Sequence, residues 1–123
     1  MTDTETPIAP NMPNKSVQQH LPLNPRELVI LASLVDGPLH GYGIIKAVEE
    51  RSDSEVVLDP ANLYRLLRRV KAVGWIEETA TDDERRKTYS LTPTGRQVVG
   101  AELRRLGRLL DRALPALTER DAV

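Results

Sequence analysis

The chain has 123 residues, of which 40% are hydrophobic and 28% charged, and its formal net charge is −1 at pH 7. This length suits one small domain with an extension. No apolar run approaches the roughly 20 residues of a membrane-spanning helix, so no membrane partner is expected. The sequence contains no cysteine, which excludes disulfides and thiolate metal sites and fits a reducing cytoplasm.

Residues 1–23 differ in character from the rest of the chain. They are polar, show no helical or strand periodicity, and are punctuated by Pro7, Pro10, Pro13 and Pro22. Such a composition predicts a flexible arm. Lys15 is the only cation before Arg26, so the segment lacks the charge of a nucleic-acid-binding arm.

A first helix is predicted from residue 24 to residue 35. Asn24 can cap it, Pro25 suits its first position, and Glu27 stands where a capping box has its acidic residue. The apolar residues at helical spacing are Leu28, Leu31, Leu34 and Val35. The run Asp36-Gly37-Pro38 then ends the helix and turns the chain.

A second helix follows this turn and frays through residues 49–54. Its inner side carries Gly41, Ile44, Ile45 and Val48. The short apolar run Val56-Val57-Leu58 is predicted to be a small strand that pairs with a hairpin further along the chain.

A third helix, residues 59–74, is the most informative element. Asp59 caps it, Pro60 occupies its first position, and Gly74 ends it. One face is apolar, with Leu63, Leu66, Leu67, Val70 and Val73. At about 100° per residue the opposite face carries Ala61, Tyr64, Arg65 and Arg68, flanked by Asn62 and Arg69 on one side and Lys71 on the other.

The side chains of this polar face suit contact with duplex DNA. Arginine makes paired hydrogen bonds to guanine edges, asparagine does so to adenine, and any of the cations can hold phosphate. The alternative is a solvated cationic face without a partner. The elements on both sides favour DNA, since helices precede this helix and a basic hairpin follows it.

The hairpin is predicted at residues 75–80 and 86–91, around the turn at residues 81–85. Tyr89 and Leu91 alternate with Thr88 and Ser90, as in a half-buried strand. Beside the turn lie the cations Arg85, Arg86 and Lys87. The acidic turn residues Asp82, Asp83 and Glu84 would repel DNA, so we expect the flank of the hairpin, not its tip, to touch the duplex. Trp75 is interpreted as a core anchor, with a ligand platform as the alternative.

The last helix begins at Thr92-Pro93 and carries a heptad seam. Its residues are Val99, Leu103, Leu106, Leu110, Ala113 and Leu117, spaced four, three, four, three and four. The natural partner is a second copy of the same helix, and the alternative is packing on its own domain. Pro115 is expected to kink or restart the helix near Leu114. Because the remaining seam is short, the first helix, with Leu28 and Leu31, is expected to contribute to the interface.

Four segments together resemble the PadR family of bacterial transcriptional regulators, over roughly residues 25–114. They are G-P-L-H-G-Y-G-I from Gly37, A-N-L-Y-R-L-L-R-R-V from Ala61, G-W-I from Gly74 and R-R-K-T-Y-S-L-T-P-T-G from Arg85. The resemblance implies a winged-helix DNA-binding domain, a C-terminal dimerisation helix and repression relieved by a small molecule of unknown identity.

Matched by position, Tyr64, Arg65 and Arg68 fall on the family's recognition helix. His40, Gly41 and Tyr42 fall at the start of its second helix, and Arg86, Lys87 and Tyr89 on its wing. Asn62 departs from the family, where Thr is commonest, which leaves open the base or phosphate that this position meets.

The predicted fold is therefore mainly α with a small β-hairpin wing, in the α+β class. Its parts are a flexible arm at 1–23, a winged helix-turn-helix at 24–92, a dimerisation helix at 93–118 and a tail at 119–123. The predicted partners are double-stranded DNA and a second copy of the chain, in a bacterial cytoplasm and at the nucleoid. A winged helix that contacts an acidic protein instead of DNA is the alternative.

No enzymatic chemistry is predicted. His20 and His40 are far apart, so no metal is expected, and nothing indicates a cofactor. Gly41-Tyr42-Gly43 resembles the opening of a dinucleotide-binding loop but lacks the third glycine and the preceding strand.

The net charge of −1 is an average over an uneven distribution of charged residues, and the local charge determines the phosphate contacts. The sites expected to bind DNA are His40, Tyr42, Asn62, Tyr64, Arg65, Arg68, Arg69, Lys71, Arg85, Arg86 and Lys87.

Overall fold

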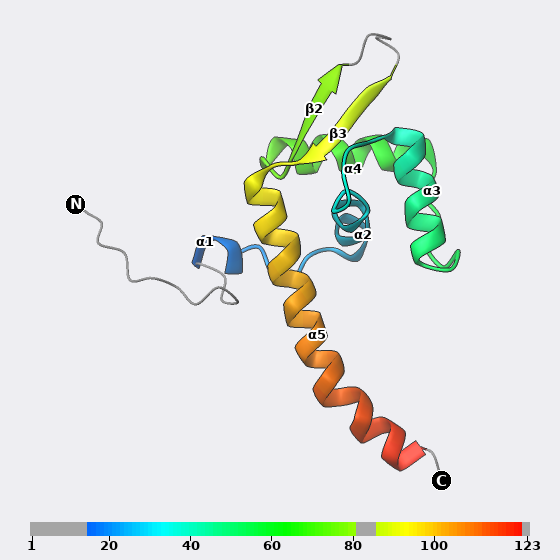
Figure 1. Ribbon diagram of the computed structural model, residues 1–123, viewed down its shortest axis with the longest axis vertical. Coiled ribbons are helices and arrows are strands. Elements are labelled where there is room, and N and C mark those ends of the chain that lie inside the picture. Colours follow the sequence, from blue (N-terminus) through cyan, green and yellow to red (C-terminus); the bar gives the residue numbers. More distant parts are fainter. Residues whose placement is uncertain (1–14, 81–85, 122–123) are drawn as a thin grey trace, which may run out of the picture.

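A computed structural model describes the backbone of residues 15–80 and 86–121. Within these residues a small sheet stands at one end of a group of helices, and the last helix projects away from the rest (Figure 1). The elements in order are α1 (Lys15–Gln18), α2 (Pro25–Ser33), β1 (Leu39–His40), α3 (Gly41–Arg51), α4 (Pro60–Ala72), β2 (Ile76–Ala80), β3 (Lys87–Leu91) and α5 (Pro93–Asp121). The predicted α+β fold with a hairpin after the third main helix is confirmed.

The sheet has three antiparallel strands in the order β1-β3-β2. Its first strand corrects one prediction, because Leu39 pairs with Tyr89 and His40 with Thr88. The run at residues 56–58 is not a strand. The Val56 N–H instead donates to the Ser52 hydroxyl at 3.0 Å, which ties this run to the end of α3.

Capping residues start the helices where the sequence predicts. The Asn24 side chain accepts from the Arg26 N–H at 2.9 Å, and Asp59 accepts from the Asn62 N–H at 2.8 Å. Glu27 does not follow its predicted role in a capping box. Its carboxylate is buried and pairs with the Arg69 guanidinium of α4, so it joins two helices.

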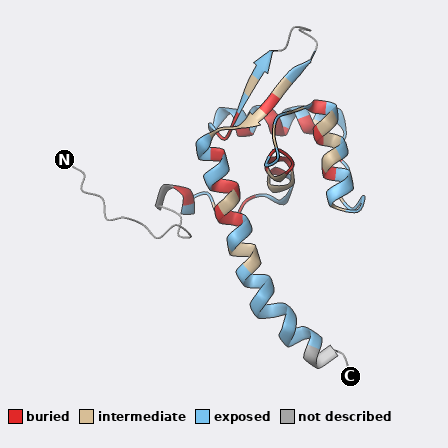
Figure 2. Ribbon diagram, viewed as in Figure 1, coloured by how far each residue is buried: buried red, intermediate tan, exposed pale blue. Residues whose placement is uncertain are grey.

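The core lies where α2, α3, α4 and the first half of α5 meet beneath the sheet (Figure 2). Its fully covered side chains include Ile30, Leu31, Leu34, Ile44, Val48, Leu63, Val70, Val98 and Val99. Trp75 is also buried, which confirms it as a core anchor. Leu31 and Val99 were predicted at a dimer interface, and this is wrong because the chain's own core covers both side chains.

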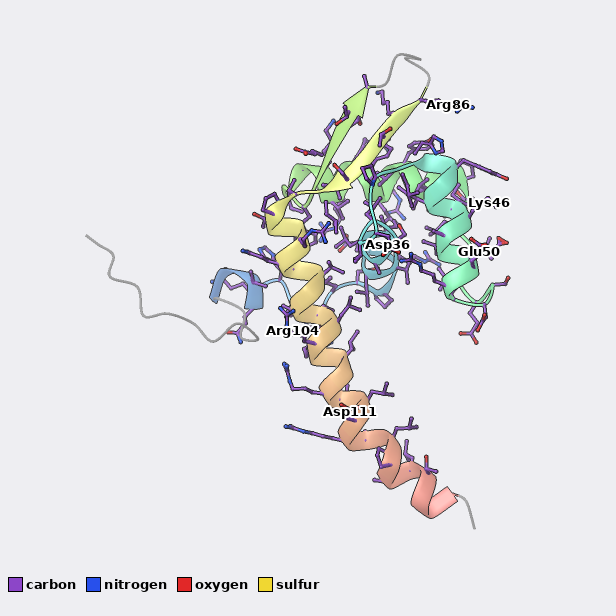
Figure 3. The ribbon with its side chains drawn as sticks, viewed as in Figure 1. Asp36, Lys46, Glu50, Arg86, Arg104 and Asp111 are labelled. Carbon is purple, nitrogen blue, oxygen red and sulfur yellow. The ribbon has the colours of Figure 1, made fainter. Side chains whose placement is uncertain are left out.

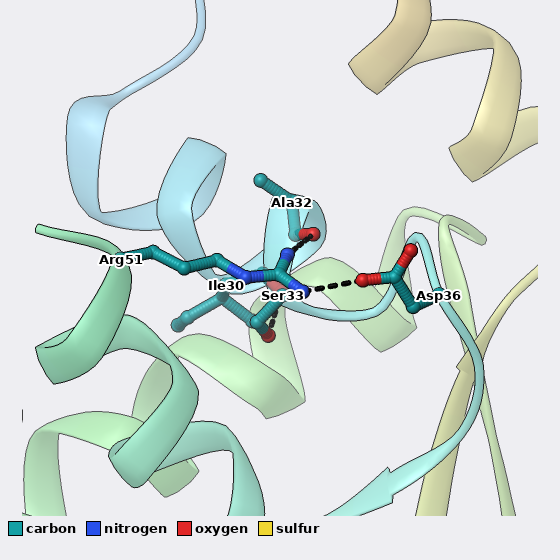
Figure 4. A network of polar contacts seen from close by, with 5 residues as sticks. All are labelled: Ile30, Ala32, Ser33, Asp36 and Arg51. Atoms are coloured by element: carbon teal, nitrogen blue, oxygen red, sulfur yellow. Dashed lines mark hydrogen bonds and ion pairs between the residues drawn. The ribbon is translucent and has the colours of Figure 1, made fainter.

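The turn between α2 and α3 is held by a network of polar contacts (Figure 4). Arg51, at the end of α3, donates to the Ala32 carbonyl at 2.8 Å and forms an ion pair with Asp36 at 2.5 Å. The Ser33 hydroxyl donates to the Ile30 carbonyl at 2.6 Å. Arg51 thus links the end of α3 to the last turn of α2 and to the turn that follows it.

The N-terminal segment packs on the domain from residue 17 onward. Val17 and Leu23 are buried, and the Leu23 N–H donates to the Glu102 carboxylate of α5 at 2.8 Å. The His20 ring meets the Trp75 ring edge-on, with 5.2 Å between centroids. The predicted flexible arm is therefore wrong for residues 17–23, whose apolar side chains and backbone have partners on α5 and beside the hairpin.

Helix α5 continues through Pro115, so of the two expected outcomes near Leu114, a kink or a restart, the restart is wrong. Proline removes one backbone hydrogen bond, to the Asp111 carbonyl, and Asp111 is exposed, where water can satisfy that oxygen. Within the described part of the chain, no helix is long and apolar enough to cross a membrane.

Candidate nucleic-acid interface

The exposed face of α4 carries the predicted base-reading side chains. Leu63, Leu66, Leu67 and Val70 are buried, and Arg65 and Arg68 are exposed on the other side. Val73 was predicted on the apolar stripe but is exposed, because it follows the last helical residue. The buried face thus turns the two arginines toward solvent.

Asn62 links the start of α4 to Arg65. Its amide nitrogen donates to the second carboxylate oxygen of Asp59 at 2.8 Å, and its amide oxygen accepts from Arg65 at 3.1 Å. Hydrogen bonds from the backbone and side chain of Asn62 hold the pKa of Asp59 below its usual range, the backbone bond contributing most. Both polar atoms of the Asn62 side chain therefore have partners within the helix, and one of them orients Arg65.

The start of α3 lies directly against Tyr64. A Cβ at Gly41 would stand 2.6 Å from the Tyr64 hydroxyl oxygen, so only glycine fits there without moving the tyrosine. The neighbouring residues His40 and Tyr42 are exposed. Lys46, which the sequence analysis did not select, lies one turn after Tyr42 with its ammonium 5.7 Å from that ring (Figure 3). Its i, i+4 spacing from Tyr42 was the available signal.

Two adjoining hollows connect these elements. The first, of about 400 Å³, is lined by His40, Gly41, Tyr42, Tyr64, Arg86, Lys87 and Tyr89. The second, of about 300 Å³, is lined by Tyr64, Leu67, Arg68, Lys71, Glu78, Lys87 and Tyr89. Because they share Tyr64, Lys87 and Tyr89, they form one cationic surface from the start of α3, across α4, to the wing. Such a surface suits a phosphate backbone.

Glu78 of β2 lies within this cationic surface, and the sequence analysis missed it. Its two carboxylate oxygens meet the ammonium groups of Lys71 at 3.4 Å and Lys87 at 3.3 Å. Partial burial raises the pKa of Glu78, but the hydrogen bond from Lys87 and the charges of both lysines outweigh it, so the pKa lies below its usual range. Glu78 is therefore a carboxylate at neutral pH, bridging α4 and the wing.

Tyr89 lies across the hairpin from Glu78 and forms part of the floor of both hollows. Burial, and then the nearby Glu78 charge, raise the pKa of Tyr89 above its usual range. The Tyr89 hydroxyl therefore adds no negative charge to this surface at neutral pH.

Arg69 is the predicted DNA-binding residue that the structure directs away from this surface, because its guanidinium pairs with Glu27 of α2. Arg85 lies outside the described residues. Arg86, which precedes β3, is exposed and lines the first hollow (Figure 3).

The second half of α5 presents an apolar groove of about 400 Å³. It is lined by Leu106, Leu109, Leu110, Ala113, Leu114 and Leu117. Leu103 is also exposed, whereas Leu28 is only half-buried against the core. Four of the predicted interface residues, from Leu103 to Ala113, thus remain available for a partner. Leu109 and Leu114 widen the face beyond the predicted seam.

Among residues 15–80 and 86–121, no group of three or more His, Cys, Asp or Glu side chains is placed to hold a metal ion.

Comparison with known proteins gives matches to sequences and to solved structures. Residues 30–101 match the family described as "Transcriptional regulator PadR-like family". An uncharacterised 37.1 kDa protein in transposon TN4556 of Streptomyces fradiae is 35% identical over 89 residues, which are 72% of this chain and 25% of that protein. The chain thus spans about a quarter of the length of this curated relative.

Two solved structures are similar in fold. Bacillus subtilis PadR in complex with operator DNA has a TM-score of 0.59 and 25% identity, covering 65% of this chain and 47% of that one. A transcriptional regulator from Clostridium thermocellum has a TM-score of 0.60 and 21% identity, covering 80% and 93%.

Proposed function

The chain belongs to the PadR-like family of transcriptional regulators, and we propose that it represses transcription as a homodimer on a palindromic operator. It is a DNA-binding regulator and not an enzyme. Repression is the direction of control that the family resemblance implies. The observation that carries the proposal is the continuous cationic surface formed by α3, α4 and the wing.

In this proposal α4 enters the major groove. Arg65 and Arg68 are exposed on the face opposite the core, so their guanidinium groups can reach base edges. Lys71 and Lys87 flank the helix and hold phosphates of the adjoining backbone. His40, Tyr42 and Arg86, which line the first hollow, extend the phosphate contacts toward the start of α3. The similar fold of Bacillus subtilis PadR, which was solved in complex with operator DNA, supports the proposal that this chain binds DNA.

The apolar groove of α5 supports the homodimer. Leu110 and Leu117 are each 57% exposed in a single chain, which places large aliphatic side chains in water along one helix face. A second copy of α5 would cover them. A two-fold dimer reads inverted half-sites, so the operator would be palindromic, and two α4 helices that read successive major grooves would lie about 34–36 Å apart.

The proposal includes a small-molecule effector of unknown identity, which the family resemblance implies. No binding site is assigned to it. Helix α5 contains no Phe, Tyr, Trp or His that would stack on a planar ligand at the dimer interface.

Selection of bound sequences from a random pool of DNA tests the proposal. We expect the selected sequences to share two inverted half-sites with centres about one helical turn, or a whole number of turns, apart. Recovery of a single half-site without symmetry would contradict binding as a dimer. A pool that shows no enrichment would contradict sequence-directed binding.

Arg68→Ala tests the orientation of α4 on the selected site. We expect it to weaken binding by about 1–3 kcal/mol and to relax the preference at one base position. Arg104→Ala is the matched control, because Arg104 is an exposed arginine on α5, outside the cationic surface (Figure 3). Equal binding by Arg68→Ala and the parent would mean that another face of α4 meets the DNA.

A further inference from the structure

The groove between α4 and the wing contains an acidic side chain where a phosphate backbone would lie. Glu78 is half-buried, with 23% of its side chain exposed, while Lys71 and Lys87 are each about half exposed at 51% and 53%. The carboxylate therefore sits beneath the two ammonium groups, which reach past it toward solvent. A phosphate approaching the lysines would come close to a second anion.

Each carboxylate oxygen of Glu78 forms an ion pair with one lysine, Lys71 on the recognition helix α4 and Lys87 on the wing. The charged residues that line this hollow are three cations, Arg68, Lys71 and Lys87, and one anion, Glu78. The net charge of the hollow is thus +2, and it would be +3 without the carboxylate. In the free protein two of the three cations already have a counter-ion built into the fold.

We propose that Glu78 is an internal counter-ion that competes with DNA phosphate for Lys71 and Lys87 and thereby limits non-specific binding. This inference rests on the proposed DNA-binding function. Non-specific affinity arises almost wholly from phosphate contacts and the release of bound salt ions, whereas base contacts add to specific affinity. A carboxylate that weakens phosphate contacts therefore reduces binding to every sequence while leaving the base contacts of Arg68 in place.

The position of Glu78 in the hairpin makes the effect specific to this groove. Side chains alternate between the two faces of a strand, so Glu77 and Glu78 point to opposite faces of β2. Glu78 pairs with Tyr89 and faces α4, whereas Glu77 pairs with Ser90 and is exposed. The neighbouring residue thus carries the same charge on the same strand but outside the hollow.

Glu78→Gln tests the proposal, with Glu77→Gln as the matched control for net charge. The probe is a duplex of mixed sequence that contains no selected site, titrated at several salt concentrations. We expect Glu78→Gln to bind this duplex about five- to tenfold more tightly at 0.1 M salt, and to steepen the dependence of log K on log salt by up to about 0.9. We expect a similar gain on the selected operator, because the phosphate contacts are shared and the base contacts of Arg68 are unchanged. Glu77→Gln should gain less than Glu78→Gln on both duplexes.

Three results would overturn the proposal. Weaker binding of Glu78→Gln to both duplexes would mean that the carboxylate positions the lysines instead of opposing phosphate. Unchanged affinity and slope would mean that it has no effect on DNA. An equal gain from Glu77→Gln would assign the effect to net charge alone.

A charge-retaining variant and a folding control separate the effect of the Glu78 charge from damage to the domain. Glu78→Asp retains the charge and should bind the non-specific duplex about as weakly as the parent protein. Thermal unfolding of each variant shows whether the domain is intact. If the parent protein itself binds no duplex, the proposed function fails; if the parent binds and Glu78→Gln has no effect, only the role of Glu78 fails.

Discussion

The two halves of α5 share one helical repeat of apolar residues and have different surroundings. In the first half Val98 and Val99 are buried, and in the second half Leu110 and Leu117 are more than half exposed. Helices α1 and α2 and strand β3 pack against the first half, whereas the second half extends beyond them (Figure 2). Apolar spacing thus identifies the face that will be covered, but not which element or which chain covers it.

Glu102 marks the border between the two halves. It is the last fully buried residue of α5, and its carboxylate receives the Leu23 N–H and the Arg105 guanidinium, the latter at 2.5 Å. From Leu103 onward the apolar side chains along the seam are exposed or only partly covered. If this division is correct, equal substitutions in the two halves should produce different failures.

The largest effect is expected from a charge in the first half. Val99→Asp would bury a carboxylate without a partner in the core, at a cost of more than about 4 kcal/mol in the free energy of unfolding. Circular dichroism should show loss of the cooperative thermal transition. A folded Val99→Asp monomer would contradict the assignment of Val99 to the core and would indicate that Val99 lies at the interface between subunits.

The same substitution in the second half should dissociate the dimer and leave the fold intact. Leu110→Asp would desolvate a charge only when two copies pair, so it should weaken dimerisation by several kcal/mol. Sedimentation equilibrium should show a monomer, and circular dichroism should show unchanged helix content at low concentration. Arg108→Asp, on the opposite side of α5, is the control that should remain dimeric. A dimeric Leu110→Asp protein would exclude the groove from the interface.

A medium effect is expected at the border. Glu102→Gln should lower the free energy of unfolding by about 1.5–3 kcal/mol at neutral pH, because it loses charge-assisted hydrogen bonds. The hydrogen bond from Arg105 outweighs burial and, with the Leu23 N–H, holds the pKa of Glu102 below its usual range.

A carboxylate whose pKa is lower in the folded state stabilises the fold above its unfolded value, about 4.3, and this stability is lost as pH falls through the lower folded value. Chemical denaturation below pH 5 should therefore show a steeper loss in the parent than in Glu102→Gln. Parallel pH dependences would remove Glu102 from this role.

The smallest effect is expected at Gly107, in the second half. A Cβ at this position meets no neighbouring atom within 4 Å, so Gly107→Ala should stabilise the helix by about 0.5–1 kcal/mol. By contrast, a Cβ at Gly95 would overlap the Trp75 carbonyl, so Gly95→Ala should destabilise the domain. Thermal unfolding distinguishes the two. Weaker dimerisation of Gly107→Ala would show that the interface is wide enough to include the Gly107 side of α5.

Local signals account for most of what the sequence predicts correctly. Helix α4 begins at a cap followed by proline and ends before Gly74, whose φ of 85° lies in the left-handed region. Both wing strands lie within one residue of their predicted bounds, since alternation and the turn between them are also local features. The division of α4 into a buried apolar face and an exposed polar face follows from the same helical period.

The errors involve partners that are distant in the chain. Strand β1 has only two residues, and its pairing with β3 defines it, while the more apolar run at residues 56–58 forms no strand. Glu27 is positioned as a cap residue, yet its partner Arg69 lies 42 residues later. Glu78 is one of several acidic residues in the hairpin, and only the fold shows that it meets lysines on two elements. Local spacing does not contain these contacts.

The position of Trp75 gives the molecule a built-in optical reporter. It is the chain's single tryptophan, it is 4% exposed between α4 and β2, and His20 of the N-terminal segment touches its ring. Indole emission shifts toward longer wavelengths when water reaches the ring. Detachment of residues 17–23 from the domain would therefore register as a red shift of a single, unambiguously assigned fluorophore, with no label added. The same emission, measured during a DNA titration, would show whether operator binding at the wing changes the contact between Trp75 and the N-terminal segment.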